Sequence, residues 1–193
     1  METVPVNAPI GLKLDKQAFL RWAESQEGRF ELKDEQVVML ARSTRQHARI
    51  VGALITALSA RLDANAWAIC PGCFAVEIGS DIRCPDVVVE RFDDDGTALS
   101  TDTPTMLVEV LSPSSVGTDM VEKLAEYTSL ASLEAYIVAS QEEPICWIWK
   151  RSGPERAFPP RPEEVAGRDK TIEITALGIS LPMAEVFRGI GTA

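Results

Sequence analysis

The sequence predicts one α/β domain built on a mixed β-sheet. Two apolar runs, residues 84–90 and 106–111, have the length and the β-branched content of buried strands. A helical stretch over about residues 119–130 follows them, and residues 134–150 contain two further strand-like runs. The order strand, helix, strand predicts a crossover between parallel strands, and hence a mixed sheet that helices cover on at least one face.

The first part of the chain predicts two helices and a hairpin. Asp15 is a typical N-cap for an amphipathic helix that Gly28 ends. Residues 29–40 have apolar ends around a polar centre, as a β-hairpin does. A long helix is expected from residue 43 or 44 to about residue 62, because its apolar residues recur at helical spacing. Residues 67–78 predict one bent strand or two short ones.

The last part of the chain carries weaker signals. Residues 152–170 are rich in proline, glycine and charge, and predict a mobile surface loop. Residues 171–190 predict a short strand, a turn and a short C-terminal helix. The chain contains no internal repeat and no linker long enough to divide it, so residues 1–193 are expected to form a single domain.

Composition restricts the classes of function. The chain has 193 residues, of which 46% are hydrophobic, so a sizeable core is available. A net charge of −10 argues against a passive nucleic-acid coat, because phosphate contacts require Lys and Arg. No apolar run approaches the roughly 20 residues that span a bilayer, and the N-terminus does not resemble a signal peptide. We therefore expect a cytoplasmic protein without a membrane partner.

Four cysteines raise the possibility of a redox or zinc site. Cys70 and Cys73 have the spacing of such sites, with Pro71-Gly72 between them. However, they lie between two strand-like runs, whereas a thioredoxin-like pair lies between a strand and a helix. Further zinc ligands could come only from Cys84, Cys146 and His47, at irregular spacing. The pattern favours a tight turn beside ordinary buried thiols, with the cysteine-based site as the alternative.

Two acids lie where burial should exclude them. Asp86 opens the apolar run Val87–Val89, and Glu109 is flanked on both sides by apolar residues. A buried carboxylate is costly unless it is paired or binds a metal. Two such strands could bring both acids to one site for Mg²⁺ or Mn²⁺, which polarises a phosphodiester and activates water. The alternative places each acid at a strand end or on a solvated face.

Three further residues could complete such a site. Glu31 begins the predicted hairpin, Lys123 follows Asp119 at i,i+4 helical spacing, and His47 is the only histidine. Each has an ordinary alternative: an exposed strand residue, a surface ion pair and a partly exposed helix residue, respectively. Three arginines make the start of the helix that carries His47 the most basic part of the chain, and it could receive a phosphate: Arg42, Arg45 and Arg49.

These residues resemble, in order and spacing, a large bacterial family described as putative restriction endonucleases and long catalogued as a domain of unknown function. It belongs to the PD-(D/E)XK nuclease superfamily. The resemblance extends over about residues 12–188. It rests on these segments: Phe30–Leu32 with Met39 and His47, Pro85–Val89, Leu107–Ser114, Asp119 with Lys123 and Tyr127, and Glu134–Val138. It implies a restriction-endonuclease-like core and a metal-dependent endonuclease that hydrolyses DNA.

The resemblance also implies roles for individual residues. Asp86 corresponds to the aspartate of the PD motif and Glu109 to the second acid, so both are expected to hold Mg²⁺ or Mn²⁺ with the main-chain carbonyl of Val110. Leu111 stands where the superfamily has its lysine. In this family the lysine lies in the next helix, which implies that Lys123 orients or helps to deprotonate water and stabilises the transition state.

Glu31 and His47 match the family's early acid and early histidine. Glu31 is expected to bind a second ion or to orient Lys123, and His47, Arg45 and Arg49 to contact substrate phosphate. The sequence departs from the family at residues 33–36, where Lys-Asp-Glu-Gln replaces a glycine-bearing turn.

Two broader expectations complete the interpretation. A homodimer is expected only by analogy with nucleases that cut both strands. The alternative function is that of a non-catalytic relative, a binding or regulatory protein that kept the fold. Because two close carboxylates repel each other, replacing either acid by alanine is expected to raise the stability of the metal-free protein slightly.

Overall fold

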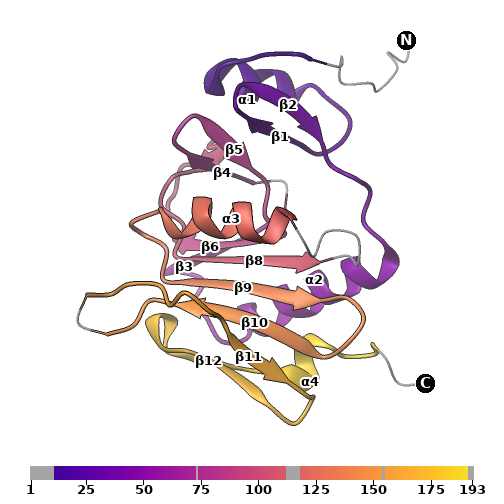
Figure 1. The fold of residues 1–193 in the computed structure, drawn as a ribbon, viewed down its shortest axis with the longest axis vertical. Helices are drawn as coiled ribbons and strands as arrows, with labels where there is room; N and C mark the ends of the chain where they lie inside the picture. Colours follow the sequence, from indigo (N-terminus) through magenta and orange to yellow (C-terminus); the bar gives the residue numbers. More distant parts are fainter. Residues whose placement is uncertain (1–10, 73, 112–117, 154, 191–193) are drawn as a thin grey trace.

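The structure, a computed structural model, describes residues 11–72, 74–111, 118–153 and 155–190. Its centre is a six-stranded mixed sheet with the strand order β11-β10-β9-β8-β6-β3 (Figure 1). Strands β8 and β9 are parallel, and all other neighbours in this sheet are antiparallel. The strands are β3 (Trp67–Pro71), β6 (Val87–Arg91), β8 (Met106–Leu111), β9 (Ala135–Ser140), β10 (Ile145–Lys150) and β11 (Glu163–Ala166).

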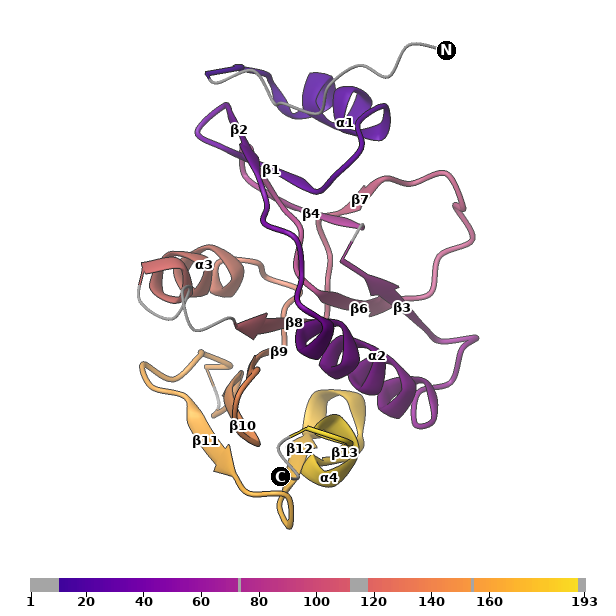
Figure 2. The same cartoon turned by 90° about the vertical axis from the view of Figure 1, so that its right-hand side faces the viewer.

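Helices cover both faces of this sheet, as Figure 2 shows. Helix α3 (Thr118–Thr128) is the crossover between β8 and β9, and packs Tyr127 against Leu107 and Tyr136. Helix α2 (Arg45–Ser59) lies on the opposite face, where it buries a set of apolar residues that recur at helical spacing: Ile50, Leu54, Ala57 and Leu58. The alternation of side chains along each strand therefore supplies two separate apolar layers.

A second sheet, with the order β2-β1-β5-β4-β7, extends from the N-terminal side of the molecule. Its strands are β1 (Phe30–Lys33), β2 (Gln36–Met39), β4 (Ala75–Ile78), β5 (Asp81–Arg83) and β7 (Ser100–Thr101). Helix α1 (Lys16–Glu24) begins at the predicted N-cap, where Asp15 Oδ1 accepts a hydrogen bond of 2.8 Å from the N–H of Ala18. The buried Phe19 joins this helix to a core that includes Phe30 and Ile82.

The C-terminal part of the described chain packs on the α2 face. A hairpin of β12 (Thr171–Ile174) and β13 (Ile179–Pro182) encloses the short 3₁₀-helix η1 (Thr175–Leu177) and leads into α4 (Met183–Val186). Val186 and Phe187 are fully buried in the same core as Ile50. None of the helices in the described part of the chain combines the length and the apolar character needed to cross a membrane.

Several predicted elements need correction. Residues 163–166 form β11, so the predicted mobile loop is wrong there; only Val165 in this strand is buried, which leaves little apolar pattern to recognise. Residues 179–182 form β13, where the sequence predicted a turn. Residues 67–78 split into β3 and β4, and these two strands belong to different sheets, which the sequence did not anticipate.

Candidate active site

The pairing of β6 with β8 sets the positions of the two central acids. Val87 lies opposite Val108, so Asp86, which directly precedes β6, lies beside Glu109 at the same end of the ladder. The N–H of Val110 donates a hydrogen bond of 2.9 Å to Asp86 Oδ2, which fixes that carboxylate against β8. Both acids are buried, with 5% of Asp86 and 7% of Glu109 exposed.

Both carboxylates open onto one cavity of about 200 Å³. Its wall comes from parts of the chain that are far apart in sequence. The lining residues that bear on the chemistry are Arg29, Arg42, His47, Asp86, Glu109, Lys123 and Tyr136. The sheet end, the start of α2 and the crossover helix α3 therefore converge on a single hollow.

Asp86 is surrounded by hydrogen-bond donors. His47 Nε2 lies 2.9 Å from Asp86 Oδ2, and Arg29 Nη1 donates to Asp86 Oδ1 at 3.3 Å. Burial acts to raise the pKa of Asp86, but the interactions with His47, the Val110 N–H and Arg29 outweigh it and lower that pKa. The aspartate is therefore held as a carboxylate even where little water reaches it.

Glu109 has a different environment. Its Oε1 accepts hydrogen bonds of 2.9 Å from Lys123 Nζ and of 2.9 Å from Tyr127 Oη. Among the described residues, none donates to its Oε2. Burial is the largest influence on its pKa and raises it; the nearby charge of Asp86 acts in the same direction, and together they outweigh Lys123. Glu109 is therefore the acid whose charge the metal-free fold neutralises least.

Glu31 forms the third acid of the cluster. Its Oε2 accepts from Arg83 Nη1 at 2.9 Å and its Oε1 from the N–H of Cys84 at 3.1 Å, while Lys123 Nζ lies 3.4 Å from Oε1. Burial acts to raise the pKa of Glu31, but Lys123 and Arg83 outweigh it and lower that pKa. Arg83 is itself held by Glu126 of α3, through two hydrogen bonds of 2.7 Å each.

Lys123 thus lies between two buried acids rather than on the surface. Its side chain is 18% exposed and reaches the sheet from the second turn of α3. Burial acts to lower its pKa, but Glu109 and Glu31 outweigh it and raise that pKa above the ordinary value. The ammonium therefore stays charged, and it can stabilise negative charge but not accept a proton.

The oxygen atoms of this cavity suit a small, hard cation. No group of three or more His, Cys, Asp or Glu side chains in the described ranges is arranged to hold a metal. However, the carboxylates of Asp86 and Glu109 can be joined by a main-chain oxygen. The N–H and C=O of one strand residue point to the same side, so the carbonyl of Val110 faces towards Asp86 as its N–H does. Three oxygen ligands with remaining water positions fit Mg²⁺ or Mn²⁺.

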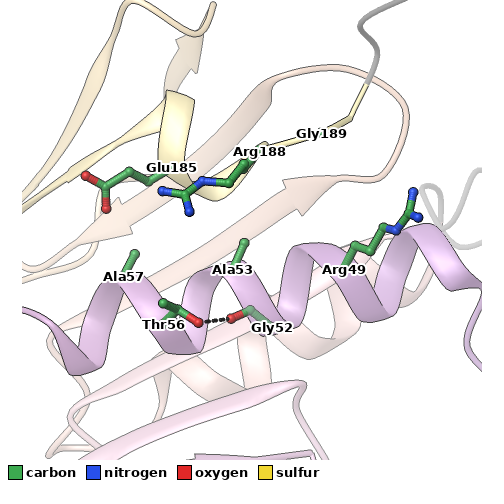
Figure 3. Close-up of a pocket in the computed structure, with 8 residues that line it drawn as sticks. All are labelled: Arg49, Gly52, Ala53, Thr56, Ala57, Glu185, Arg188 and Gly189. Atoms are coloured by element: carbon green, nitrogen blue, oxygen red, sulfur yellow. Dashed lines mark hydrogen bonds between the residues drawn. The ribbon is translucent and has the colours of Figure 1, made fainter.

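The basic residues at the start of α2 divide between two places. His47 and Arg42 line the cavity with the acids. Arg49 instead lines a separate groove of about 490 Å³ between α2 and α4, with Glu185 and Arg188 (Figure 3). Arg45 is exposed and belongs to neither lining. The structure therefore brings together His47 and the acids, but not Arg45 or Arg49.

Sequence reasoning missed Arg29, Arg83 and Tyr136 as site residues. Arg29 could have been found, because alternation along the hairpin places it on the same side as Glu31, two residues later. Arg83 and Tyr136 carry no such signal: one precedes the Cys84-Pro85-Asp86 corner, and the other has the appearance of an ordinary aromatic core residue.

Cys70 and Pro71 end β3, and Gly72 lies in the turn towards β4, where the N–H of Phe74 donates a hydrogen bond of 3.0 Å to the Pro71 carbonyl. Cys73 lies outside the described residues. Burial raises the pKa of the Cys70 thiol, and raises those of Cys84 and Cys146 to about 12, so these thiols are poor nucleophiles at neutral pH.

Gly72, in this turn, packs closely against Arg29 of the candidate site. A Cβ at this position would lie 2.8 Å from Arg29 Nη2 and 3.0 Å from the Pro85 carbonyl oxygen. The same Arg29 Nη2 donates to the Cys84 carbonyl at 2.7 Å. Because Gly72 has no Cβ, the Arg29 guanidinium can occupy the space beside this turn and reach Asp86.

Three comparisons agree with this architecture. The chain is 29% identical over 131 residues to the uncharacterized protein slr1290 of Synechocystis sp. (strain ATCC 27184 / PCC 6803 / Kazusa), covering 66% of this chain and 69% of that protein. The crystal structure of a putative nuclease belonging to DUF820 from Anabaena variabilis ATCC 29413 matches with a TM-score of 0.70 at 13% identity, over 93% of this chain and 98% of that one. This similarity confirms the predicted restriction-endonuclease-like fold. The family model described as Uma2, putative restriction endonuclease, matches residues 17–184, and the chain therefore belongs to that family.

Proposed function

We propose that this protein is a metal-dependent endonuclease that hydrolyses phosphodiester bonds in DNA. The observation that supports it best is the convergence of Asp86, Glu109 and Lys123 on one cavity, with Glu31 3.4 Å from the Lys123 ammonium. In this proposal Asp86, Glu109 and the carbonyl of Val110 hold Mg²⁺ or Mn²⁺. When bound, the ion supplies a Lewis acid that polarises the phosphodiester and lowers the pKa of water.

The remaining residues act on charge and orientation. Lys123 holds its positive charge beside the place where negative charge develops on the phosphate, which is the largest single contribution in many such sites. Because its pKa is raised, we assign it no part in removing a proton from water. Glu31 orients Lys123, and Arg83 keeps Glu31 ionised for that task. His47, in the first turn of α2, and Arg42, in the segment before this helix, lie where a substrate phosphate can be bound.

DNA is the proposed substrate because the family is described as restriction endonucleases. Cleavage of both strands by one enzyme is simplest with two active sites, so a homodimer is the proposed assembly. Because the chain is acidic overall, its contacts with DNA phosphates must come from local basic residues rather than from the net charge.

One set of observations favours the second candidate, a non-catalytic relative that binds nucleic acid or protein. The net charge is −10, and the site's own hydrogen-bond donors already pair with its acids: Arg29 and His47 with Asp86, and Lys123 with Glu109. A metal would have to compete with these partners. This alternative predicts that the protein binds divalent ions weakly and leaves DNA intact.

Incubation with supercoiled and linear DNA tests the proposal directly. Parallel reactions contain Mg²⁺, Mn²⁺ or EDTA, and Glu109→Gln is the matched variant because it keeps the shape of the side chain and removes its charge. We expect the parent protein to nick or linearise DNA with either ion, and neither the EDTA reaction nor the variant to do so. Intact DNA in all parent reactions would favour the non-catalytic alternative, and equal cleavage by Glu109→Gln would reject the site.

A further inference from the structure

Two neighbouring tyrosines in the core beside the site differ in one respect. The rings of Tyr127 and Tyr136 lie 5.1 Å apart in an edge-to-face arrangement, and both side chains are fully buried. Tyr127 Oη donates its hydrogen bond to Glu109. Tyr136 Oη has no hydrogen-bond partner among the described residues. A buried hydroxyl without a partner is uncommon, because it has lost its contacts with water and regained nothing.

The position of Tyr136 in the sheet places this side chain in the cavity wall. Tyr136 lies opposite Leu107 in the β8–β9 ladder, on the face that carries Glu109 and α3. It lines the same cavity as Asp86, Glu109 and Lys123. Its ring is held between Tyr127 and Trp149, whose ring stacks on it at 5.7 Å. The side chain is therefore fixed, and its hydroxyl cannot turn to solvent for a partner.

The hydroxyl is also a donor at any ordinary pH. Burial raises the pKa of Tyr136 well above its usual value, and the charges of Glu109 and Asp86 act in the same direction. A phenol that stays protonated can donate one strong hydrogen bond to an anionic oxygen. Lys123, Arg42 and Arg29 give the same cavity a set of cations that attract an anion.

We infer that Tyr136 binds substrate: its hydroxyl donates a hydrogen bond to a phosphate oxygen that enters the cavity between the acids and Lys123. The inference rests on the proposed function for the chemical class of this ligand. It assigns Tyr136 to the site as a fixed donor that finds no partner in the described part of the chain and gains one when the phosphate binds. The competing acceptor is a water bound to the metal. Measuring the affinities for metal and for DNA independently distinguishes this water from a phosphate oxygen.

The test compares Tyr136→Phe with Tyr127→Phe. Each variant removes one hydroxyl, and the two ring centres lie 5.1 Å apart. Three quantities are measured for each variant: the melting temperature without metal, the Kd for Mn²⁺ alone by calorimetry, and the Kd for a short DNA duplex in Ca²⁺ by fluorescence anisotropy. We expect Tyr136→Phe to weaken DNA binding about tenfold, as loss of one hydrogen bond to a charged group does. Its melting temperature should be unchanged or higher, because an unpaired buried hydroxyl has been removed. Its Kd for Mn²⁺ should stay within about twofold of the parent value, which is a smaller change than the loss of one hydrogen bond would cause.

Tyr127→Phe is expected to lower the melting temperature, because Glu109 loses a donor. Equal DNA affinity for the parent and Tyr136→Phe would overturn the inference, and so would a fall in melting temperature as large as that of Tyr127→Phe. A weakened Mn²⁺ Kd with the same loss for DNA would assign the hydroxyl to a metal-bound water and reject the phosphate contact. None of the three measurements requires cleavage. A parent protein that binds DNA in Ca²⁺ but never cleaves it would therefore overturn the proposed function alone.

Discussion

The ammonium of Lys123 lies 2.9 Å from Glu109 Oε1, although the two residues are 14 positions apart and on different elements. A strand residue cannot supply this charge, because Leu111 occupies the place two residues after Glu109. The crossover helix α3 supplies it instead, by running back across the sheet face that carries Glu109. Fold connectivity and site chemistry are thus linked, since any parallel β8–β9 pair requires such a crossover.

The first prediction concerns this lysine. Lys123→Met should lower the rate of DNA cleavage about a hundredfold or more, as expected when a charge contact to the transition state is lost. Lys123→Arg should fold and bind metal but not restore the full rate, because a guanidinium differs in shape from an ammonium. Single-turnover cleavage of supercoiled DNA measures both.

Stability provides the control for that experiment. Glu31 and Glu109 share the Lys123 cation, so the metal-free Lys123→Met variant should melt at a lower temperature than the parent protein. Lys33→Met is the matched control: Lys33 pairs with Glu122 at the surface, where an ion pair contributes at most about 1 kcal/mol. Parent-rate cleavage by Lys123→Met would show that the lysine is not catalytic.

Strong apolar periodicity made much of the fold predictable. The run at residues 106–111 is β8 to the residue, and Asp15 caps α1 as its residue type suggests. The proximity of Asp86 and Glu109 was also predictable. A buried carboxylate is costly unless it is paired or binds a metal, and two such acids on apolar strands are therefore expected to share one site. In these places local pattern and tertiary packing agree.

The rest depended on long-range geometry. Nothing local says that β3 and β4, on either side of one tight turn, join different sheets. Arg83 and Tyr136 reach the site through pairing with Glu126 and through the β8–β9 register, which are tertiary relationships. Arg49 shows the opposite error: it is near His47 in sequence, but helical spacing turns it towards another groove.

The second prediction concerns the β1–β2 turn. Asp34 and Glu35 have φ angles of +49° and +64°, the left-handed conformation that favours glycine in a two-residue hairpin turn. Glu35→Gly should therefore stabilise the protein by about 1 kcal/mol. Urea unfolding measures the change, with Glu24→Gly, in the last turn of α1, as a control that should instead destabilise. A loss of stability in Glu35→Gly would contradict the assignment of strain to this turn.

The third prediction concerns Gly72. The added methyl group of Gly72→Ala would displace Arg29 from Asp86, which should destabilise the protein by about 1–3 kcal/mol. Part of that effect should disappear in an Arg29→Ala background, because the residue that clashes is then gone. Gly96→Ala is the control, since a Cβ there meets nothing within 4 Å. Equal effects in both backgrounds would rule out a clash with Arg29.

The last prediction separates the two central acids by the sign of their effect on stability. Repulsion between them suggests that replacing either one stabilises the metal-free protein. For Asp86 that expectation conflicts with its environment, because Arg29, His47 and the Val110 N–H all lose a charged acceptor. Asp86→Asn should cost about 1–3 kcal/mol at pH 7. Glu109→Gln should be neutral or stabilising, because Gln can still accept from Lys123 and Tyr127 while the disfavoured charge is gone.

The pH dependence of these two effects follows from the pKa directions. The pKa of Asp86 is lowered in the fold, so its contribution is present above the unfolded value of about 3.8 and is lost as pH falls through the folded pKa. The pKa of Glu109 is raised, so its ionisation destabilises the fold as pH rises from about 4.5 through the folded pKa. Thermal melts in EDTA from pH 3.5 to about 8 should therefore show the gain of Glu109→Gln growing with pH. Added Mg²⁺ should reverse the order, because it stabilises the parent but not Glu109→Gln. A gain that is constant across the pH range would mean that the fold does not disfavour the Glu109 charge.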